Sequence, residues 1–559
     1  MTRASRTIAA CTAMALLAAA QPSFAAWALD GVRVANNTLI ASLPVVAPDG
    51  YGGILVAWME DINQMGHTNQ GAVYVQRIAS DGTVIWGATG IKLTLGNSEG
   101  FTPLVTADGE GGAIVAWSDP LTLAGARIQR VNFLGSQVWT TGGAPVGPQI
   151  AFEWAHALVP DGVGGVTVLF VDWRDGESDF YLQRLNASGV GQWGTGVPVC
   201  IGAWSKGDGL LIPDGEGGVI AAWHDQRSDP DSDVYAQRVN FLATALWTTS
   251  GVQMTTLPGS ESAFTMTGDG ASGLIGAWSY NLDIFAQRLD FGGTKQWGAT
   301  GLSVAVIPTS NQFAPTVATD DNGGAFIFWK DTRSGNGTQI YGERLDGSGA
   351  AYWIPGGIPL SGTPGSISGG YIHAVRDGNG GAIVAFGKSP VGDYEARAMR
   401  VDDLGSVLWN ESALSATYHI SVPEIVGSAT GEAILAWQDN RGAPNDQNYA
   451  MKVPFIASGV DDHAPSIGAV RILSVNPNPF NGSAQVQLDV ERGGPLALEI
   501  FDVAGRRVWS GRDAVGGPGG ASIRIRAHDD SGAALASGVY FLRVTSHGVT
   551  ATHRLVVLR

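Results

Sequence analysis

The chain has 559 residues, of which 50 are acidic and 33 are basic, so its formal net charge is −17. This balance argues against nucleic acid or an anionic membrane as a partner, because both are bound through clustered basic side chains. Glycine supplies 79 residues, about twice the usual fraction, which favours a fold with many tight turns.

Residues 1–25 have the pattern of a signal peptide. Arg3 and Arg6 precede an apolar run, and Ser23-Phe24-Ala25 provides a small-residue cleavage site. No later run reaches the roughly 18 apolar residues that a membrane span requires. We therefore expect an exported protein whose mature chain keeps one cysteine, Cys200, and no internal disulfide framework. Cys200 is expected to be a small, buried apolar residue.

One unit recurs through residues 26–455. It begins with Asp-Gly-x-Gly-Gly, followed after four residues by an aromatic side chain, and it contains four short β-type segments separated by Gly and Asp turns. The aromatic recurs about every 54 residues, at Trp58, Trp117, Phe170, Trp223, Trp278, Trp329, Phe386 and Trp437. This period predicts an all-β fold, an eight-bladed β-propeller with four-stranded blades. The region resembles the repeats of bacterial secreted propellers without indicating a specific family.

The last unit lacks its fourth strand, and a matching strand stands at the other end of the repeat region. Residues 27–34 (WALDGVRV) match residues 86–93 (WGATGIKL), which form a fourth strand, position for position. We predict that the N-terminal strand completes the last blade and closes the ring, because an open ring would leave two unpaired sheet edges.

Residues present in every unit are expected to hold the blades together. Fourteen of the 18 Trp belong to the repeat, and their large apolar faces suit packing between sheets. Seven third strands carry a recurring Arg, such as Arg77, that needs an acidic partner once buried. We expect that partner two residues after the first aromatic, at Glu60, Asp119, Asp172, Asp225, Asp331 or Asp439. The pattern Asp-x-Arg, as in Asp172/Arg174, predicts ion pairs that brace the loops.

Function in a symmetric scaffold is expected in the departures from the repeat. Trp154, Trp173 and Trp204 lie outside it, in loops that should emerge on one face of the third and fourth blades. The same loops contain three further candidate binding residues, His224, Arg174 and Arg227. Aromatic side chains beside charged groups predict a patch that binds a polysaccharide or a surface protein. The alternative is that these Trp cap the apolar ends of their blades.

The sequence offers one candidate metal site and no catalytic motif. Asp229, Asp231 and Asp233 could bind Ca²⁺, which prefers several carboxylate oxygens. Their loop lacks the Gly and the terminal Glu of an EF-hand, which favours a solvated acidic loop; no other cofactor is predicted. No zinc-protease, serine-hydrolase or phosphate-loop motif is present, so no catalytic residue is predicted. The leading hypothesis is a non-enzymatic binding or adhesion module. The alternatives are a secreted carbohydrate-active hydrolase or lyase with carboxylates at the central opening, and a structural surface-layer component.

Residues 456–469 have the composition of a linker, and residues 470–559 contain no copy of the repeat. Four motifs follow one another there: residues 476–480 (NPNPF), 498–509 (LEIFDVAGRRVW), 537–544 (SGVYFLRV) and 553–559 (HRLVVLR). This region resembles the C-terminal sorting domain of type IX secretion cargo and the related domain of flagellar hook-capping proteins. The resemblance implies a small immunoglobulin-like β-sandwich. It also implies recognition by outer-membrane secretion machinery, with delivery to the cell surface or the extracellular space.

Overall fold

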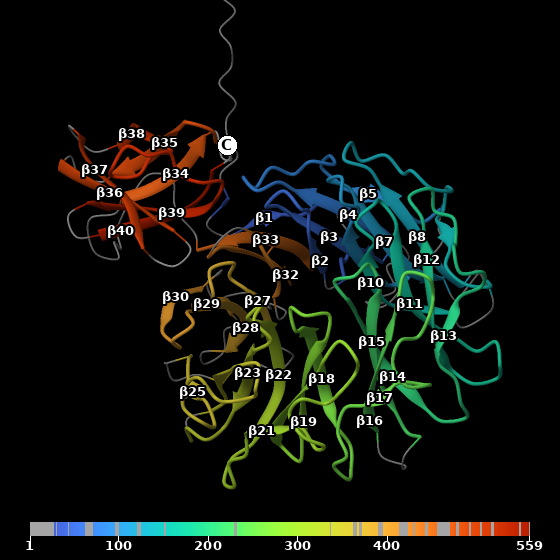
Figure 1. The fold of residues 1–559 in the computed structure, drawn as a ribbon. Coiled ribbons are helices and arrows are strands. Elements are labelled where there is room, and N and C mark those ends of the chain that lie inside the picture. Colours follow the sequence, from blue (N-terminus) through green and yellow to red (C-terminus); the bar gives the residue numbers. More distant parts are fainter. Residues whose placement is uncertain are drawn as a thin grey trace, which may run out of the picture. The chain divides into compact units, whose positions relative to one another are not determined.

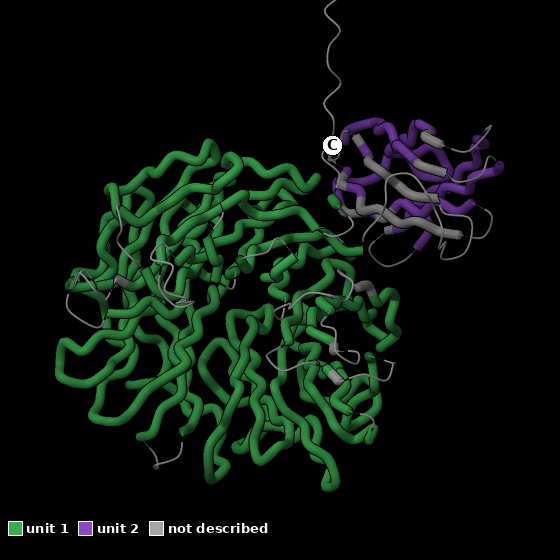
Figure 2. The backbone as a smooth tube through the Cα atoms, turned by 180° about the vertical axis from the view of Figure 1, so that it is seen from behind, with its two compact units in different colours: residues 1–458 green, residues 459–559 purple. Residues whose placement is uncertain are grey.

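The computed structural model forms two compact units, Met1–Ser458 and Gly459–Arg559 (Figure 2). The predicted signal peptide and the predicted linker lie outside the described residues. Among the residues described there is no helix long and apolar enough to cross a membrane. The structure describes residues 27–28, 31–37, 39–42, 44–61, 71–95, 100–119, 125–149, 153–227, 232–335, 337–361, 366–367, 372–389, 395–412, 423–428, 431–441, 445–454, 470–476, 480–490, 494–502, 506–515, 519–546 and 549–557.

Unit 1 is built from antiparallel sheets, of which the described residues form eight (Figure 1). The first four contain β2 (Val45–Pro48), β3 (Ile54–Glu60), β4 (Ala72–Ile78) and β5 (Ile91–Lys92); β6 (Phe101–Ala107), β7 (Ala113–Asp119), β8 (Gly125–Val131) and β9 (Ala144–Pro145); β10 (Trp154–Pro160), β11 (Val166–Asp172), β12 (Asp179–Leu185) and β13 (Val197–Cys200); β14 (Lys206–Pro213), β15 (Val219–Asp225), β16 (Asp233–Val239) and β17 (Val252–Gln253). The other four contain β18 (Ser262–Gly268), β19 (Leu274–Tyr280), β20 (Asp283–Leu289) and β21 (Leu302–Ala305); β22 (Gln312–Thr319), β23 (Ala325–Asp331), β24 (Gln339–Leu345) and β25 (Ile358–Pro359); β26 (Ser366–Ile367), β27 (His373–Arg376), β28 (Ala382–Ser389), β29 (Glu395–Val401) and β30 (Val407–Ser412); β31 (Glu424–Gly427), β32 (Ala433–Asp439), β33 (Gln447–Val453) and β1 (Val32–Arg33).

The sheets follow one another in a ring. The first strand of each sheet contacts the first strand of the next, and β31 of the last sheet contacts β2 of the first. Figure 1 shows these sheets arranged around a common centre. Apolar cores fill the space between neighbouring sheets, and the second-strand Trp, such as Trp223, are fully buried there. The predicted all-β propeller fold is confirmed.

The N-terminal strand completes the last sheet, as predicted. β1 pairs antiparallel with β33 through Val32↔Ala450 and Arg33↔Tyr449. Trp27 Nε1 donates a hydrogen bond to Ser80 O in the first sheet, at 2.9 Å. Five other fourth-strand Trp make the same kind of bond to the following sheet, for example Trp86 to Phe133 O at 3.0 Å.

The predicted partner of the third-strand Arg was wrong. Arg238 Nε donates to Asp214 Oδ2 at 2.9 Å, so the partner is the aspartate of the Asp-Gly-x-Gly-Gly turn. The reason is the register, because Val219, just after this turn, pairs with Val239, next to Arg238. The acid after the aromatic lies at the opposite end of the second strand. The other pairs of this type are Arg77–Asp49, Arg130–Asp108, Arg184–Asp161, Arg288–Asp269, Arg344–Asp320 and Arg400–Asp377.

The Gln that precedes this Arg connects the third strand to the fourth. Gln237 Oε1 accepts the backbone N–H of Trp247 at 3.0 Å, and its Nε2 donates to Thr248 O at 2.9 Å. These bonds extend the pairing of a short fourth strand. The repeat residues therefore have the structural role that the sequence predicted for them.

Unit 2 is the predicted β-sandwich. One sheet has the order β34-β35-β38 and the other the order β37-β36-β39-β40. Leu488, Ile500, Ile525 and Leu542, which come from both sheets, are fully buried in one shared core. The strands are β34 (Val470–Asn476), β35 (Ser483–Val490), β36 (Gly494–Asp502), β37 (Arg507–Val515), β38 (Gly519–Arg526), β39 (Gly538–Ser546) and β40 (Val549–Val557).

Replacing Trp27 should weaken ring closure. Trp27→Ala removes the hydrogen bond to Ser80 O and a half-buried ring, so we expect a loss of about 2 kcal/mol in the free energy of unfolding, less than for a fully buried Trp. Urea unfolding and size-exclusion chromatography would measure the loss and the oligomers formed by an exposed edge. Trp173→Ala, at a Trp that is 53% exposed, is the control with little expected change. Equal stability of the two variants would contradict the closing role.

Candidate functional site

The three propeller Trp outside the repeat lie at the same end of two neighbouring sheets. Trp154 begins β10 and pairs with Val171, near the end of β11. Trp173 directly follows β11, and Trp204 precedes β14. Because β10 contacts β14, the third and fourth sheets present these residues side by side. We call this end, where second-to-third-strand loops and links between sheets emerge, the loop end.

Trp204 is half-buried between two cations. Lys206 Nζ and the Arg227 guanidinium carbon each lie 5.2 Å from its ring centroid, the geometry of a cation–π contact. The Lys206 side chain is fully buried, 2.7 Å from Asp179 Oδ1 in the preceding sheet. Its ammonium also donates to Gly202 O at 2.6 Å. Trp204 and Lys206 therefore join the two sheets.

Arg227 braces its loop, as predicted. It forms an ion pair with Asp225 and donates to Ser250 O at 2.7 Å. Its guanidinium stacks on Tyr235, 4.0 Å from the ring centroid. Burial works to raise the pKa of Asp225, but hydrogen bonds from Arg227 and Trp223 outweigh burial and hold that pKa below its usual value. The pair is therefore ionised and fixed in place.

Cys200 lies against the same ion pair and is buried, as predicted. Its thiol donates to Asp225 Oδ2 at 3.3 Å, while Arg227 Nη2 donates to Sγ at 2.8 Å. Burial, together with the Asp225 carboxylate, raises the pKa of Cys200 to about 12, although Arg227 opposes the shift. The thiol is neutral near pH 7, which is unsuited to nucleophilic chemistry.

Trp173 is the most exposed of the six predicted binding residues, at 53%. The next residue, Arg174, is held by Asp172, by Thr195 O at 2.9 Å and by the ring of Tyr181 at 3.7 Å. Burial lowers the pKa of Arg174, but Asp172 more than offsets it, so the pKa is raised. Trp173 is thus an exposed aromatic on a braced loop.

Trp154 and His224 have different surroundings. Trp154 is half-buried and packs edge-on against Phe101, with ring centroids 6.0 Å apart. His224 is buried on the opposite face of its sheet from Trp223 and Asp225, because side chains alternate along β15. Its Nδ1 lies 3.2 Å from Asp208 Oδ2. Burial lowers the pKa of His224, and Asp208 opposes the shift. The structure therefore brings together Trp204 and Arg227, with His224 apart from them.

Titratable side chains also occur on the innermost strands, where sequence reasoning did not place them. His373 on β27 and Glu424 on β31 approach to 3.7 Å between Nε2 and Oε1, and each side chain is 35% exposed. His156 on β10 is half-buried; desolvation lowers its pKa, and Asp208 on β14 opposes the shift. No spacing rule reveals such groups, because each comes from a different sheet.

The proposed calcium ligands are described only in part. Asp233 is buried, and its Oδ2 accepts a hydrogen bond from Gln253 Nε2 at 2.9 Å. Asp229 and Asp231 lie outside the described residues. Within the part of the chain that the structure describes, no group of three His, Cys, Asp or Glu is arranged to hold a metal ion. Calcium binding stays a prediction.

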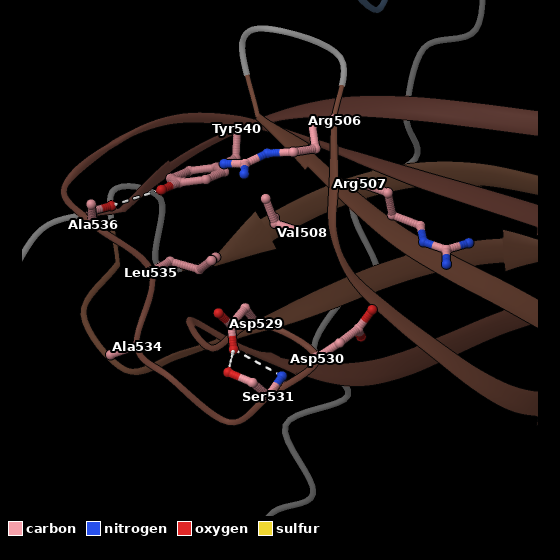
Figure 3. A pocket seen from close by; sticks show the side chains of 10 residues that line it. All are labelled: Arg506, Arg507, Val508, Asp529, Asp530, Ser531, Ala534, Leu535, Ala536 and Tyr540. Carbon is pink, nitrogen blue, oxygen red and sulfur yellow. Dashed lines mark hydrogen bonds between the residues drawn. The ribbon is translucent and has the colours of Figure 1, made fainter.

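Unit 2 contains a cavity of about 430 Å³ (Figure 3). Tyr540 lies along one wall and donates to Ala536 O at 3.1 Å, with Leu535 and Val508 nearby. Asp529 accepts the backbone N–H of Ser531 at 2.9 Å and so shapes the opposite wall. The cavity combines apolar walls with charged groups and was not foreseen from the sequence.

Comparison with known families identifies the kind of domain that the C-terminal region forms. Residues 474–558 match the family described as the secretion system C-terminal sorting domain. The predicted resemblance is confirmed. The protein is exported to the cell surface or the extracellular space.

No match to the chain is found among curated proteins. Three solved structures are similar to it in shape. A puromycin hydrolase has 13% identity, a TM-score of 0.41, and coverage of 75% of this chain and 61% of its own. The Dos1 propeller has 10% identity, a TM-score of 0.42, and coverage of 74% and 93%. A polysaccharide lyase, ulvan lyase, has 10% identity, a TM-score of 0.42, and coverage of 75% and 95%.

The environment of Cys200 predicts an unreactive thiol. At pH 8, raising the pKa from its usual value to about 12 lowers the thiolate fraction on the order of a thousandfold. In the chain without residues 1–25, where Cys200 is the single cysteine, modification by a disulfide reagent should therefore be very slow until urea unfolds the protein. Equal rates in folded and unfolded protein would refute the buried, neutral thiol.

Proposed function

We propose that the propeller is a non-enzymatic binding or adhesion module and that its ligand, a polysaccharide or another surface protein, binds at the loop end of the third and fourth sheets. The observation that supports this is the 53% exposure of Trp173 on a loop fixed by the Asp172–Arg174 ion pair. A loop that is already held in position loses little freedom on binding. Its flat apolar face suits stacking on a sugar ring or on apolar side chains of a protein.

In this proposal Trp204 and Arg227 position the loops, since both are engaged with Lys206, Asp225 and the core between the sheets. In the same proposal the sorting domain directs the propeller out of the cell. Residues 470–559 would engage the outer-membrane secretion machinery, and the family match over residues 474–558 supports that partner.

Trp173→Ala should weaken ligand retention. Loss of a central aromatic contact typically costs tenfold or more in affinity. The chain without residues 1–25 would be passed over immobilised polysaccharides and outer-membrane proteins, and retention measured for wild type and variant. Tyr51→Ala is the matched control, because Tyr51 is 61% exposed on a turn at the opposite end of its sheet. Retention that falls equally in both variants, or in neither, would count against the loop end.

A second candidate function is a carbohydrate-active hydrolase or lyase. The approach of His373 to Glu424 on neighbouring innermost strands favours it, since an acid and a base from different sheets could share a substrate at the central opening.

This candidate makes a separate prediction for the same panel. If the protein is an enzyme, soluble product should appear with wild type, and Glu424→Gln should lower its rate at least a hundredfold, as expected for loss of a general acid or base. Reducing-end and unsaturated-product assays would measure it, with Trp173→Ala as a variant that keeps the acid. Retention of polysaccharide without product would rule out this candidate and favour the binding module.

A further inference from the structure

The turns between first and second strands share one pattern around most of the ring, and the turn of the sixth sheet differs from it at the residue after the aspartate. In most sheets the residue after the turn aspartate is a glycine in the left-handed region, for example Gly215 at φ +76° and Gly378 at φ +70°. In the sixth sheet the sequence is Asp320-Asp321-Asn322-Gly323-Gly324. Asp321 takes this position with φ +60°, in the left-handed region that glycine favours and that aspartate adopts more readily than most residues with a Cβ.

The seventh sheet also differs from the repeat, at the residue before the turn aspartate. The residue before the turn aspartate is small or proline elsewhere, such as Pro213, Gly268 and Thr319, but it is Arg376 in the seventh sheet. Arg376 Nη1 donates to Asp321 Oδ2 across the boundary between the sheets. Asp321 and Arg376, each of which differs from the repeat at its position, therefore contact each other.

This ion pair differs from the other turn pairs in its exposure. In the repeat pair the side chains of Arg238 and Asp214 are 2% and 1% exposed, whereas those of Arg376 and Asp321 are 57% and 52% exposed. Exposed ion pairs contribute little to stability. Folding stability therefore gives little reason for this exposed aspartate–arginine pair.

The pair borders a cavity of about 390 Å³ between the two turns, lined also by Thr319, Asn322, Gly378 and Gly380. This volume lies in the range of small-ligand pockets, about 300–1,000 Å³. A Cβ added at Gly380 would meet no atom within 4 Å, so this wall is open. Thr319 Oγ1 accepts the N–H of Asp321 at 3.0 Å and fixes the carboxylate-bearing residue.

The charges of the cavity are balanced. Asp320 is engaged by Arg344 at 3.3 Å, and Asp321 by Arg376, so no cation is left to attract an anionic ligand. The exposed groups include a donor, the Arg376 guanidinium, and an acceptor, the Asp321 carboxylate. Neighbouring hydroxyls of a sugar ring donate and accept at once and can satisfy both groups.

We propose that this cavity is a second binding site of the propeller, for an uncharged saccharide. It rests on the proposed binding function but not on Trp173, because these turns lie at the opposite end of the sheets from the loop end. Sites at both ends would let one molecule hold two polysaccharide chains.

Calorimetric titration of the chain without residues 1–25 tests the site, with cellohexaose, xylohexaose and mannohexaose as neutral probes and inorganic phosphate as the anionic one. Asp321→Gly and Arg376→Thr restore residues that the repeat itself uses, so both variants should fold with an unchanged or raised melting temperature. Each should weaken hexasaccharide binding at least tenfold. Glu216→Ala, in the corresponding turn of the fourth sheet, should leave it unchanged.

The proposal is overturned if no hexasaccharide binds at millimolar concentration, or if both variants bind hexasaccharide with the affinity of the wild type. It is also overturned if phosphate binds to the wild type in place of a hexasaccharide and the two substitutions abolish that binding. Trp173→Ala separates the two sites. If Trp173→Ala abolishes hexasaccharide binding while Asp321→Gly and Arg376→Thr do not, the result supports the binding site at the loop end and refutes the site at the cavity. The reverse result supports the cavity and removes the case for Trp173.

Discussion

The propeller depends on a buried ion pair between the turn aspartate and the third-strand arginine. Asp214 accepts two turn N–H groups through Oδ1, from Glu216 and Gly218, and the Arg238 guanidinium through Oδ2. Arg238 extends onward to the next sheet, where it lies 4.0 Å from the Phe291 ring and donates to Phe291 O. Because a buried charge is costly unless it is paired, the pair fixes the turn, the sheet and its neighbour together.

In the last sheet, where the ring closes, the aspartate–arginine pair is replaced by other contacts. In the last sheet Ser428 stands at the position of the turn aspartate, and its Oγ donates to Gly52 O in the first sheet at 2.7 Å. Lys452, at the position of the arginine, pairs with Glu432 at 2.6 Å. The seam is thus held by the added strand β1 and by bonds between the two ends of the repeat region, so closure couples residues nearly 400 positions apart.

The residues that recur from sheet to sheet hold the sheets and turns together. Ligand recognition is therefore expected at residues that differ from the repeat. At the loop end Trp204 and Arg227 are drawn into the contact between sheets, whereas Trp173 stays exposed. At the turn end Asp321 and Arg376 form a solvent-facing pair beside a cavity. A ring with rigid, nearly equivalent sheets can carry separate sites on its two ends, and the sorting domain delivers such a scaffold to the outside of the cell.

The all-β class, the four-stranded unit, the closing strand and the sorting domain could all be predicted from the sequence, because each is a periodic or contiguous pattern. The sequence located Asp172–Arg174 and Asp225–Arg227, whose members are two residues apart, and the unusual Trp. It misassigned the partner of Arg238, because nearness in sequence did not show which strand ends meet. Three contacts are visible only in the folded chain: Asp214 with Arg238, Glu424 with His373, and Arg376 with Asp321. These contacts depend on strand register and on neighbouring sheets in a closed ring, which no local pattern encodes.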